Sequence, residues 1–180
     1  MAAEKATTAF APPALTQTVR PSPETTTRSG PHPALIFFRT DVAGCGPDRV
    51  AVSGDGRTVW VSDGGGNAVV AFSAAKLLSD PAHALVARVA VGQRPLGLML
   101  VNHGAQLIVA DSDRDKARGG GANLAVIDVQ RALRRQPALT GFLRTGSTPR
   151  QFALEPGGGR LLVVDTGSGQ VQAVKIGHLT

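Results

Sequence analysis

One pattern of glycine, proline and aspartate recurs three times along this chain at a constant internal spacing. Each copy is anchored on a proline with a glycine three residues before it, a glycine nine residues after it and an aspartate sixteen residues after it. The positions are Gly44, Pro47, Gly56 and Asp63, then Gly92, Pro95, Gly104 and Asp111, then Gly146, Pro149, Gly158 and Asp165. Four positions fixed in three copies indicate an internal structural repeat.

The first two copies have the length and the strand pattern of a four-stranded propeller blade, and the third copy has the first three of these strands. The anchor prolines lie 48 and 54 residues apart, close to the roughly 40–50 residues of one blade. Apolar segments predict first strands at 49–53, 96–101 and 150–154, second strands ending at the three aspartates, third strands at 68–72, 123–128 and 170–176, and fourth strands at 85–91 and 139–145. The sequence therefore predicts an all-β fold, a partial β-propeller of four-stranded antiparallel blades.

Short helices are expected between the third and fourth strands of the first two copies. Residues 73–80 and 129–136 carry leucine and alanine at helical spacing. Pro81 and Pro137 follow them closely, and proline ends a helix because it lacks the backbone N–H. We expect helices of one to two turns.

The predicted strands are offset by one strand relative to whole blades. The third copy has no fourth strand after it, whereas Ala34–Thr40 forms an extra apolar segment before the first anchor, and its Phe38-Arg39-Thr40 resembles Leu143-Arg144-Thr145. This gives about twelve strands, with repeats at 44–91, 92–145 and 146–178 and an orphan outer strand at 34–40. Residues 1–33 are rich in proline and threonine and predict a disordered leader before a propeller segment at 34–180.

Three blades are too few to close a ring, because propellers typically have four to eight. An open arc exposes sheet faces and strand edges. Two arrangements solve this problem: the chain is the C-terminal part of a larger propeller, or two copies associate head to tail to complete a ring. We favour the fragment, because the leader carries no recognisable targeting signal.

The repeat resembles a known family. The order Gly-x-x-Pro, apolar strand, glycine and then Val-Trp-Val-Ser-Asp at 59–63, or Leu-Val-Val-Asp at 162–165, resembles the YVTN-type β-propeller repeat over about residues 34–178. The resemblance implies kinship with seven-bladed, lactonase-like propellers and a periplasmic or secreted location. The matching positions build the blade, so they indicate the fold more than the function.

Composition excludes several classes of protein. The net charge of +6 is scattered along the chain, which is typical of a basic surface. Cys45 is the single cysteine, so no disulfide forms within the chain. No apolar run approaches the ~20 residues of a membrane span. Six phenylalanines and one tryptophan offer few stacking platforms, so nucleic acid is not the expected partner.

Candidate binding residues lie on the loop face, meaning the connections before the anchor prolines and the turns after the repeat aspartates. Arg49, Arg94 and Arg150 lie beside these prolines. Either they bind an anionic ligand through their guanidinium donors, or they are surface arginines paired with nearby aspartates. We keep all three as candidates for binding a small anionic ligand or an unknown protein.

The repeat aspartates have two interpretations. A ring of carboxylates is one way to hold a cation, but recurrence in every copy favours a structural role in which each aspartate accepts backbone N–H bonds. The insertion after Asp111 adds Asp113 and Asp115 and so resembles the start of a calcium loop. Its sixth position is Lys116 instead of glycine, so we expect a solvated loop and no metal, and keep Asp111 and Asp113 as ligand-contacting candidates.

No catalytic constellation is visible in the sequence. The four histidines, His32, His83, His103 and His178, all fall away from the expected loop face, and there is no Gly-x-Ser-x-Gly elbow. The expected function is a non-enzymatic scaffold or binding module without a cofactor. The alternatives are part of a lactonase-like hydrolase of the 6-phosphogluconolactonase kind and a nucleic-acid-binding propeller.

Overall fold

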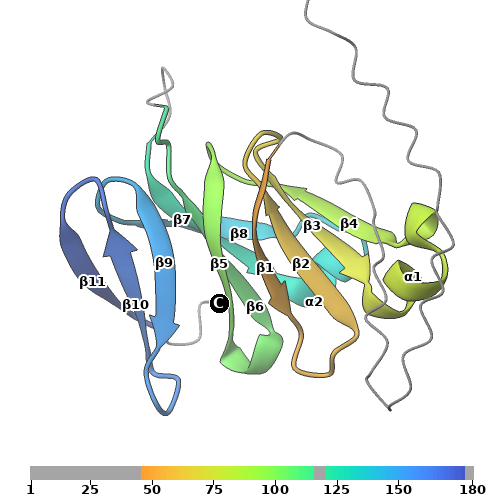
Figure 1. Ribbon diagram of the computed structural model, residues 1–180. Coiled ribbons are helices and arrows are strands. Elements are labelled where there is room, and N and C mark those ends of the chain that lie inside the picture. The colour runs from red at the N-terminus through yellow and green to blue at the C-terminus, as the bar shows by residue number, and fades with distance from the viewer. Residues whose placement is uncertain (1–45, 116–120, 177–180) are drawn as a thin grey trace, which may run out of the picture. The chain divides into compact units, whose positions relative to one another are not determined.

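The computed structural model describes residues 46–115 and 121–176 (Figure 1). The expected leader, the expected strand at 34–40 and Gly44 lie outside the described residues. The boundary between leader and propeller segment therefore stays a prediction. Within the described residues the chain forms three antiparallel sheets, one from each copy of the repeat.

The three sheets follow the chain in order, and each is a meander. The first sheet consists of β1 (Pro47–Val52), β2 (Thr58–Asp63), β3 (Ala68–Ser73) and β4 (Leu85–Ala90). The second consists of β5 (Pro95–Val101), β6 (Gln106–Asp111), β7 (Asn123–Asp128) and β8 (Leu139–Arg144). The third has β9 (Pro149–Leu154), β10 (Arg160–Asp165) and β11 (Gln170–Lys175). The predicted all-β fold and its blade pattern are confirmed.

Both predicted helices are present and are capped by their own sequence. Helix α1 spans Ala74–Ser79, and the Ser73 hydroxyl accepts the first-turn N–H of Lys76. Helix α2 spans Val129–Leu133, and its Asp128 carboxylate accepts the N–H of Arg131 at 2.8 Å. Such side-chain acceptors satisfy backbone donors that have no partner within the first helical turn.

Alternation along the strands builds a core on each side of the second sheet. One core lies between the first and second sheets and includes Trp60, Leu107 and Ile127, all without exposed surface. The other lies between the second and third sheets and includes Leu124 and Val163. Because successive strand residues point to opposite faces, the second sheet supplies apolar side chains to both cores.

The first strands of the three sheets are neighbours in space. Strand β5 packs against β1 on one side and β9 on the other, as Figure 1 shows. The approach of β5 to β9 depends on Gly97, because a Cβ there would lie 2.5 Å from the carbonyl oxygen of Arg150. Glycine in a strand commonly marks such a close approach of backbones.

Candidate functional site

The loops predicted to share one face do lie at one end of the strands. Each anchor proline pairs in register with its repeat aspartate, for example Pro95 with Asp111. The residue after each aspartate donates its N–H to the residue before the proline: Gly64 to Gly46 at 2.9 Å, Ser112 to Arg94 at 3.1 Å and Thr166 to Thr148 at 3.0 Å. This repeated backbone bond joins the turn after each repeat aspartate to the connection that enters the same sheet.

Each repeat aspartate is buried and accepts a backbone N–H. Asp111 accepts from Gly92 at 2.9 Å and Asp165 from Gly146 at 3.1 Å, so both hold the connection that enters their own sheet. Asp63 accepts from Gly66 in the turn that follows it, at 2.9 Å. A Cβ on Gly92 would lie 2.5 Å from the Asp111 carboxylate, which explains a glycine at this repeat position. Across residues 46–115 and 121–176, no group of histidine, cysteine, aspartate and glutamate side chains could hold a metal ion.

The second carboxylate oxygens of the three aspartates differ. That of Asp63 pairs with the Arg88 guanidinium at 3.0 Å, and that of Asp165 accepts the Thr145 hydroxyl at 2.7 Å. The second oxygen of Asp111 is buried without a hydrogen-bond partner. Burial raises the pKa of Asp111 to about 7, because the charged form loses its hydration.

The sequence does show why Asp111 and Asp165 differ in their hydrogen-bond partners, at a position outside the four repeat positions. The residue before the conserved glycine is Thr145 in the third copy and Val91 in the second. Valine has no hydroxyl to donate, so the carboxylate of the second sheet has one donor fewer. Asn123, which pairs with Asp111 across β6 and β7, adds a second buried acceptor oxygen without a partner.

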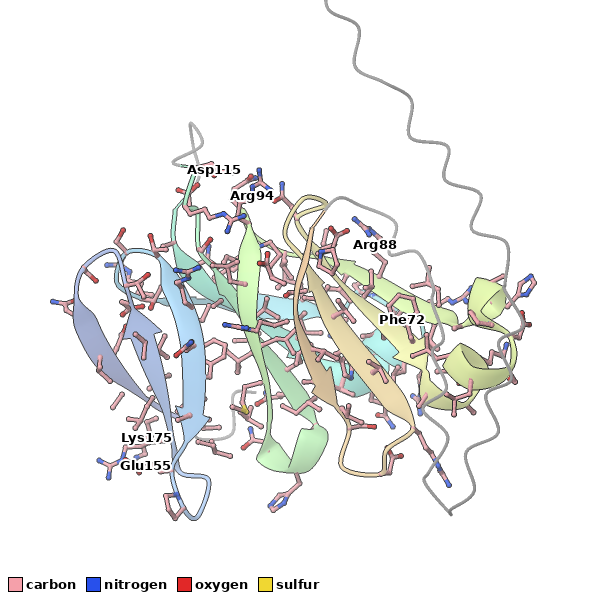
Figure 2. The ribbon with its side chains drawn as sticks, in the orientation of Figure 1. Phe72, Arg88, Arg94, Asp115, Glu155 and Lys175 are labelled. Atoms are coloured by element: carbon pink, nitrogen blue, oxygen red, sulfur yellow. The ribbon has the colours of Figure 1, made fainter. Side chains whose placement is uncertain are left out.

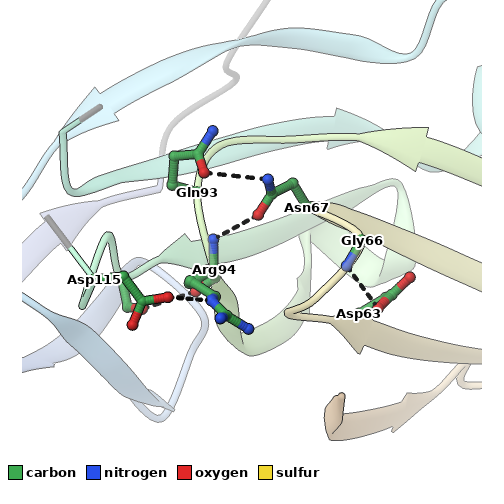
Figure 3. Close-up of polar contacts among 7 residues, drawn as sticks. Asp63, Gly66, Asn67, Gln93, Arg94 and Asp115 are labelled. Atoms are coloured by element: carbon green, nitrogen blue, oxygen red, sulfur yellow. Dashed lines mark hydrogen bonds and ion pairs between the residues drawn. The ribbon is translucent and has the colours of Figure 1, made fainter. Parts of the chain in front are cut away.

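Arg94 is placed on the loop face as predicted, but its charge is neutralised. Its guanidinium forms an ion pair with Asp115, and its backbone N–H donates to the Asn67 side chain at 3.0 Å (Figure 3). Asn67 in turn donates to Gln93 at 3.1 Å. Arg94 thus has the geometry of a paired surface arginine. Asp113 lies in the same loop, and its backbone N–H donates to the Gln93 carbonyl at 3.0 Å.

Arg49 and Arg150, unlike Arg94, line the same pocket. Both line one pocket of about 360 Å³ on the inner strands β1, β5 and β9, with Gly97, Leu98, Gln151 and Phe152 as the other lining residues. Both arginines are exposed, and within the described part of the chain no ion pair joins either guanidinium to a carboxylate. Gly97 lies at the repeat position occupied by Arg49 and Gln151, so its missing side chain leaves room between the two cations.

The described histidines lie outside this pocket. His103 is in the short 3₁₀ turn Asn102–Gly104 that joins β5 to β6, at the strand end opposite the loop face. His83 forms an exposed contact with Asp80 at 3.0 Å beside α1. Figure 2 marks the two ends of the strands, with Arg94 and Asp115 at one and Glu155 and Lys175 at the other. No helix in the described residues is long and apolar enough to cross a membrane.

Among the comparisons with known proteins, the comparison with solved structures indicates the fold. No protein-family model matches the chain, and no curated protein matches it in sequence. A solved structure of a putative 6-phosphogluconolactonase from Bacteroides fragilis is similar, with a TM-score of 0.62 and 23% identity over 76% of this chain. A periplasmic gluconolactonase from Pseudomonas aeruginosa has a TM-score of 0.51 and 22% identity over 74% of this chain.

A third similar structure is named as a WD40 domain and not as a lactonase. It is the C-terminal WD40 domain of Sif2, with a TM-score of 0.51 and 15% identity over 72% of this chain. The chain spans 36%, 41% and 33% of the length of these three structures. At such identities the likeness shows the fold, a β-propeller of the kind that lactonase-like and WD40 proteins share.

Proposed function

We propose that this chain is a propeller binding module that holds a small anionic ligand between Arg49 and Arg150. The observation that carries the proposal is that both arginines line one pocket and that no ion pair joins either guanidinium to a described carboxylate. Guanidinium groups bind carboxylate and phosphate through paired N–H donors in a fixed geometry. A pocket with two such groups and no acidic lining residue favours an anion.

The other lining residues suit a ligand that is polar at one end. Leu98 and Phe152 supply apolar surface, and Gln151 supplies both a donor and an acceptor. Ligand sites commonly combine an apolar wall with a few placed polar groups. A sugar acid or a sugar phosphate matches this lining, because it offers an anionic group and hydroxyls on a compact ring.

Binding is favoured over catalysis by what the lining offers. Hydrolysis of an ester requires a group that takes up or releases a proton, and arginine does not lose its proton in proteins. The six lining residues include no histidine, aspartate or glutamate.

Lactone hydrolysis is the second candidate function. It is favoured by the likeness to a putative 6-phosphogluconolactonase and a periplasmic gluconolactonase, whose names imply sugar-lactone substrates. In that case the proton-transferring groups come from outside the described pocket. The likeness to a periplasmic gluconolactonase supports an exported location for this chain, which fractionation of the native cells would test.

The test is a calorimetric titration of the full chain with inorganic phosphate and with 6-phosphogluconate. We expect Arg49→Gln and Arg150→Gln each to weaken binding by on the order of tenfold or more, because each removes a charge-assisted hydrogen bond. The matched control is Arg57→Gln, since Arg57 is exposed and lies outside the pocket. Equal affinity in all four proteins would overturn the proposal, and gluconolactone hydrolysis above background would favour the second candidate.

A further inference from the structure

A second pocket lies between the outer strand of the first sheet and the helix of the second sheet. Its volume is about 330 Å³. The β4 residues Leu85–Val89 form one wall, and Ala132, Arg135 and Gln136 at the end of α2 form the other. We call this pocket the β4–α2 groove. It shares no lining residue with the anion pocket on the inner strands.

One wall of the groove is the outer edge of a strand. Strand β4 pairs with β3, and within the described residues no strand pairs with the other edge of β4. The register of β3 and β4 shifts between Ala71 and Phe72, and this β-bulge leaves Val86 without a partner in β3. An extended peptide commonly binds by lying along such an edge and bonding to its backbone.

The Arg135 side chain reaches from the end of α2 to this edge. Its Nε–H donates to the Val86 carbonyl oxygen at 3.0 Å, which orients the guanidinium and uses one of its five N–H donors. In the described part of the chain, no ion pair joins Arg135 to a carboxylate. The remaining Nη donors therefore have the geometry to bind a carboxylate from another molecule.

Arg135 occupies a backbone position that favours glycine. The Gln136 N–H donates to the Arg131 carbonyl oxygen, and the Arg135 N–H donates to that of Ala132, both at 2.9 Å. This Schellman motif places Arg135 at a φ of 58°, in the left-handed region. Directly after α1, Asp80 has a φ of −153° instead. The blade repeat therefore does not require this arginine, and such costly backbone conformations cluster at functional sites.

The surroundings of the groove favour an acidic and partly apolar ligand. Arg131, Arg134 and Arg135 are all exposed, and none has an ion pair within the described residues. The described lining residues include no acidic side chain, and Leu85 supplies apolar surface with 44% of it exposed. They also include no aromatic ring on which a nucleic-acid base could stack.

We propose that the β4–α2 groove binds an extended acidic segment of a partner protein. The segment lies along the outer edge of β4, packs an apolar side chain on Leu85 and pairs a carboxylate with Arg135. Strand residues advance about 3.3 Å each, so a segment of about six residues follows the wall that Leu85–Val89 form. The basic end of α2 attracts the acidic segment and excludes a basic one.

The test is a calorimetric titration of the full chain with the peptide acetyl-Glu-Val-Glu-Leu-Glu-Val-amide, in which acidic and apolar residues alternate. We expect saturable binding, with a dissociation constant raised on the order of tenfold by Arg135→Gln and by Leu85→Asp. The matched control is Arg134→Gln, which removes the same charge one residue away and outside the groove. It should change the dissociation constant by less than about twofold, because an exposed charge without a direct contact is screened by salt.

A second variant at position 135 separates binding from folding. Arg135→Gly should relieve the left-handed conformation, so its thermal unfolding midpoint should stay close to that of the parent. It should weaken peptide binding as much as Arg135→Gln does. Unchanged affinity in Arg135→Gly would overturn the proposal, as would equal effects of Arg134→Gln and Arg135→Gln.

Ligands of other chemistry test the class of partner. The same peptide with lysine in place of glutamate, and a single-stranded oligonucleotide, should each bind on the order of tenfold more weakly. No binding of the glutamate peptide, equal binding of the lysine peptide, or tighter binding of the oligonucleotide would overturn the proposal. Saturating 6-phosphogluconate should leave peptide affinity unchanged, because the anion pocket is separate, and competition would place the peptide there instead.

Discussion

Asp111 accepts the backbone N–H of Gly92 at 2.9 Å through one carboxylate oxygen, while its other oxygen is buried without a partner. Burial raises the pKa of Asp111 to about 7 in the folded chain. The folded state therefore binds a proton more tightly than the unfolded state does. The free energy of unfolding should fall as the pH rises from about 4 to about 7, and the contribution of Asp111 should be constant above that range.

Asp111→Asn should remove this pH dependence. The variant keeps an oxygen for the Gly92 N–H but carries no charge, so it should be more stable than the parent at pH 8 and differ little at about pH 3, below the pKa of Asp111 in both states. The gain at pH 8 is at most about 4 kcal/mol, from about 1.4 kcal/mol for each pKa unit. Thermal unfolding at both pH values, followed by Trp60 fluorescence, measures it. Parallel stability curves for parent and variant would show that Asp111 is not protonated in the folded chain.

Thr145→Val and Val91→Thr should change the stability of the chain in opposite directions, because they remove a hydroxyl donor from Asp165 and add one near Asp111. Thr145→Val removes the hydroxyl that donates to Asp165 at 2.7 Å, and should cost about 1–3 kcal/mol because a buried acceptor loses its partner. Val91→Thr supplies the equivalent hydroxyl near Asp111. It should stabilise the chain at pH 8 and reduce the fall in stability between pH 4 and 7. A Val91→Thr variant that is less stable at every pH would contradict this explanation.

Gly97→Ala should weaken the packing of β5 on β9. The added Cβ would lie 2.5 Å from the Arg150 carbonyl oxygen, a backbone atom with little freedom to move. We expect a loss of about 1–3 kcal/mol in denaturant unfolding, as for other overpacked positions. The matched control is Gly141→Ala in β8, where a Cβ meets nothing within 4 Å. It should be neutral or slightly stabilising, and equal losses for both variants would argue against the close approach.

The blade pattern was predictable because it depends on local spacing. Strand segments follow from apolar runs between glycine turns, and α1 and α2 follow from helical spacing before a proline. The partners of the candidate site residues were not predictable in the same way. Arg94 pairs with Asp115 across a connection and an insertion, and nothing in the repeat shows that this arginine is neutralised while Arg49 is not.

The closeness of Arg49 to Arg150 also depends on long-range geometry. The two residues are separated by an entire sheet in the chain and meet only because β5 packs between β1 and β9. Gly97 is the one sequence signal for this arrangement, because it lacks a side chain where the other two copies have Arg49 and Gln151. Its meaning depends on the backbone of β9, which a single sequence does not show.

The Arg94–Asp115 ion pair leads to a prediction about which arginines bind the anion. It is exposed, and exposed pairs typically contribute about 0–1 kcal/mol. Arg94→Gln should therefore change unfolding by less than about 1 kcal/mol and leave phosphate binding unchanged. Weakened binding in this variant would move the anion site from the inner strands to the loop face.

The central claim, that Arg49 and Arg150 share one anionic ligand, is tested most directly by NMR of the arginine side chains. In nitrogen-labelled protein, the Nε–Hε resonances of Arg49 and Arg150 should shift together during titration with 6-phosphogluconate and give one dissociation constant. Those of Arg57 and Arg94 should stay in place, because neither lines the pocket. Shifts spread over all exposed arginines, or none at Arg49 and Arg150, would contradict the claim.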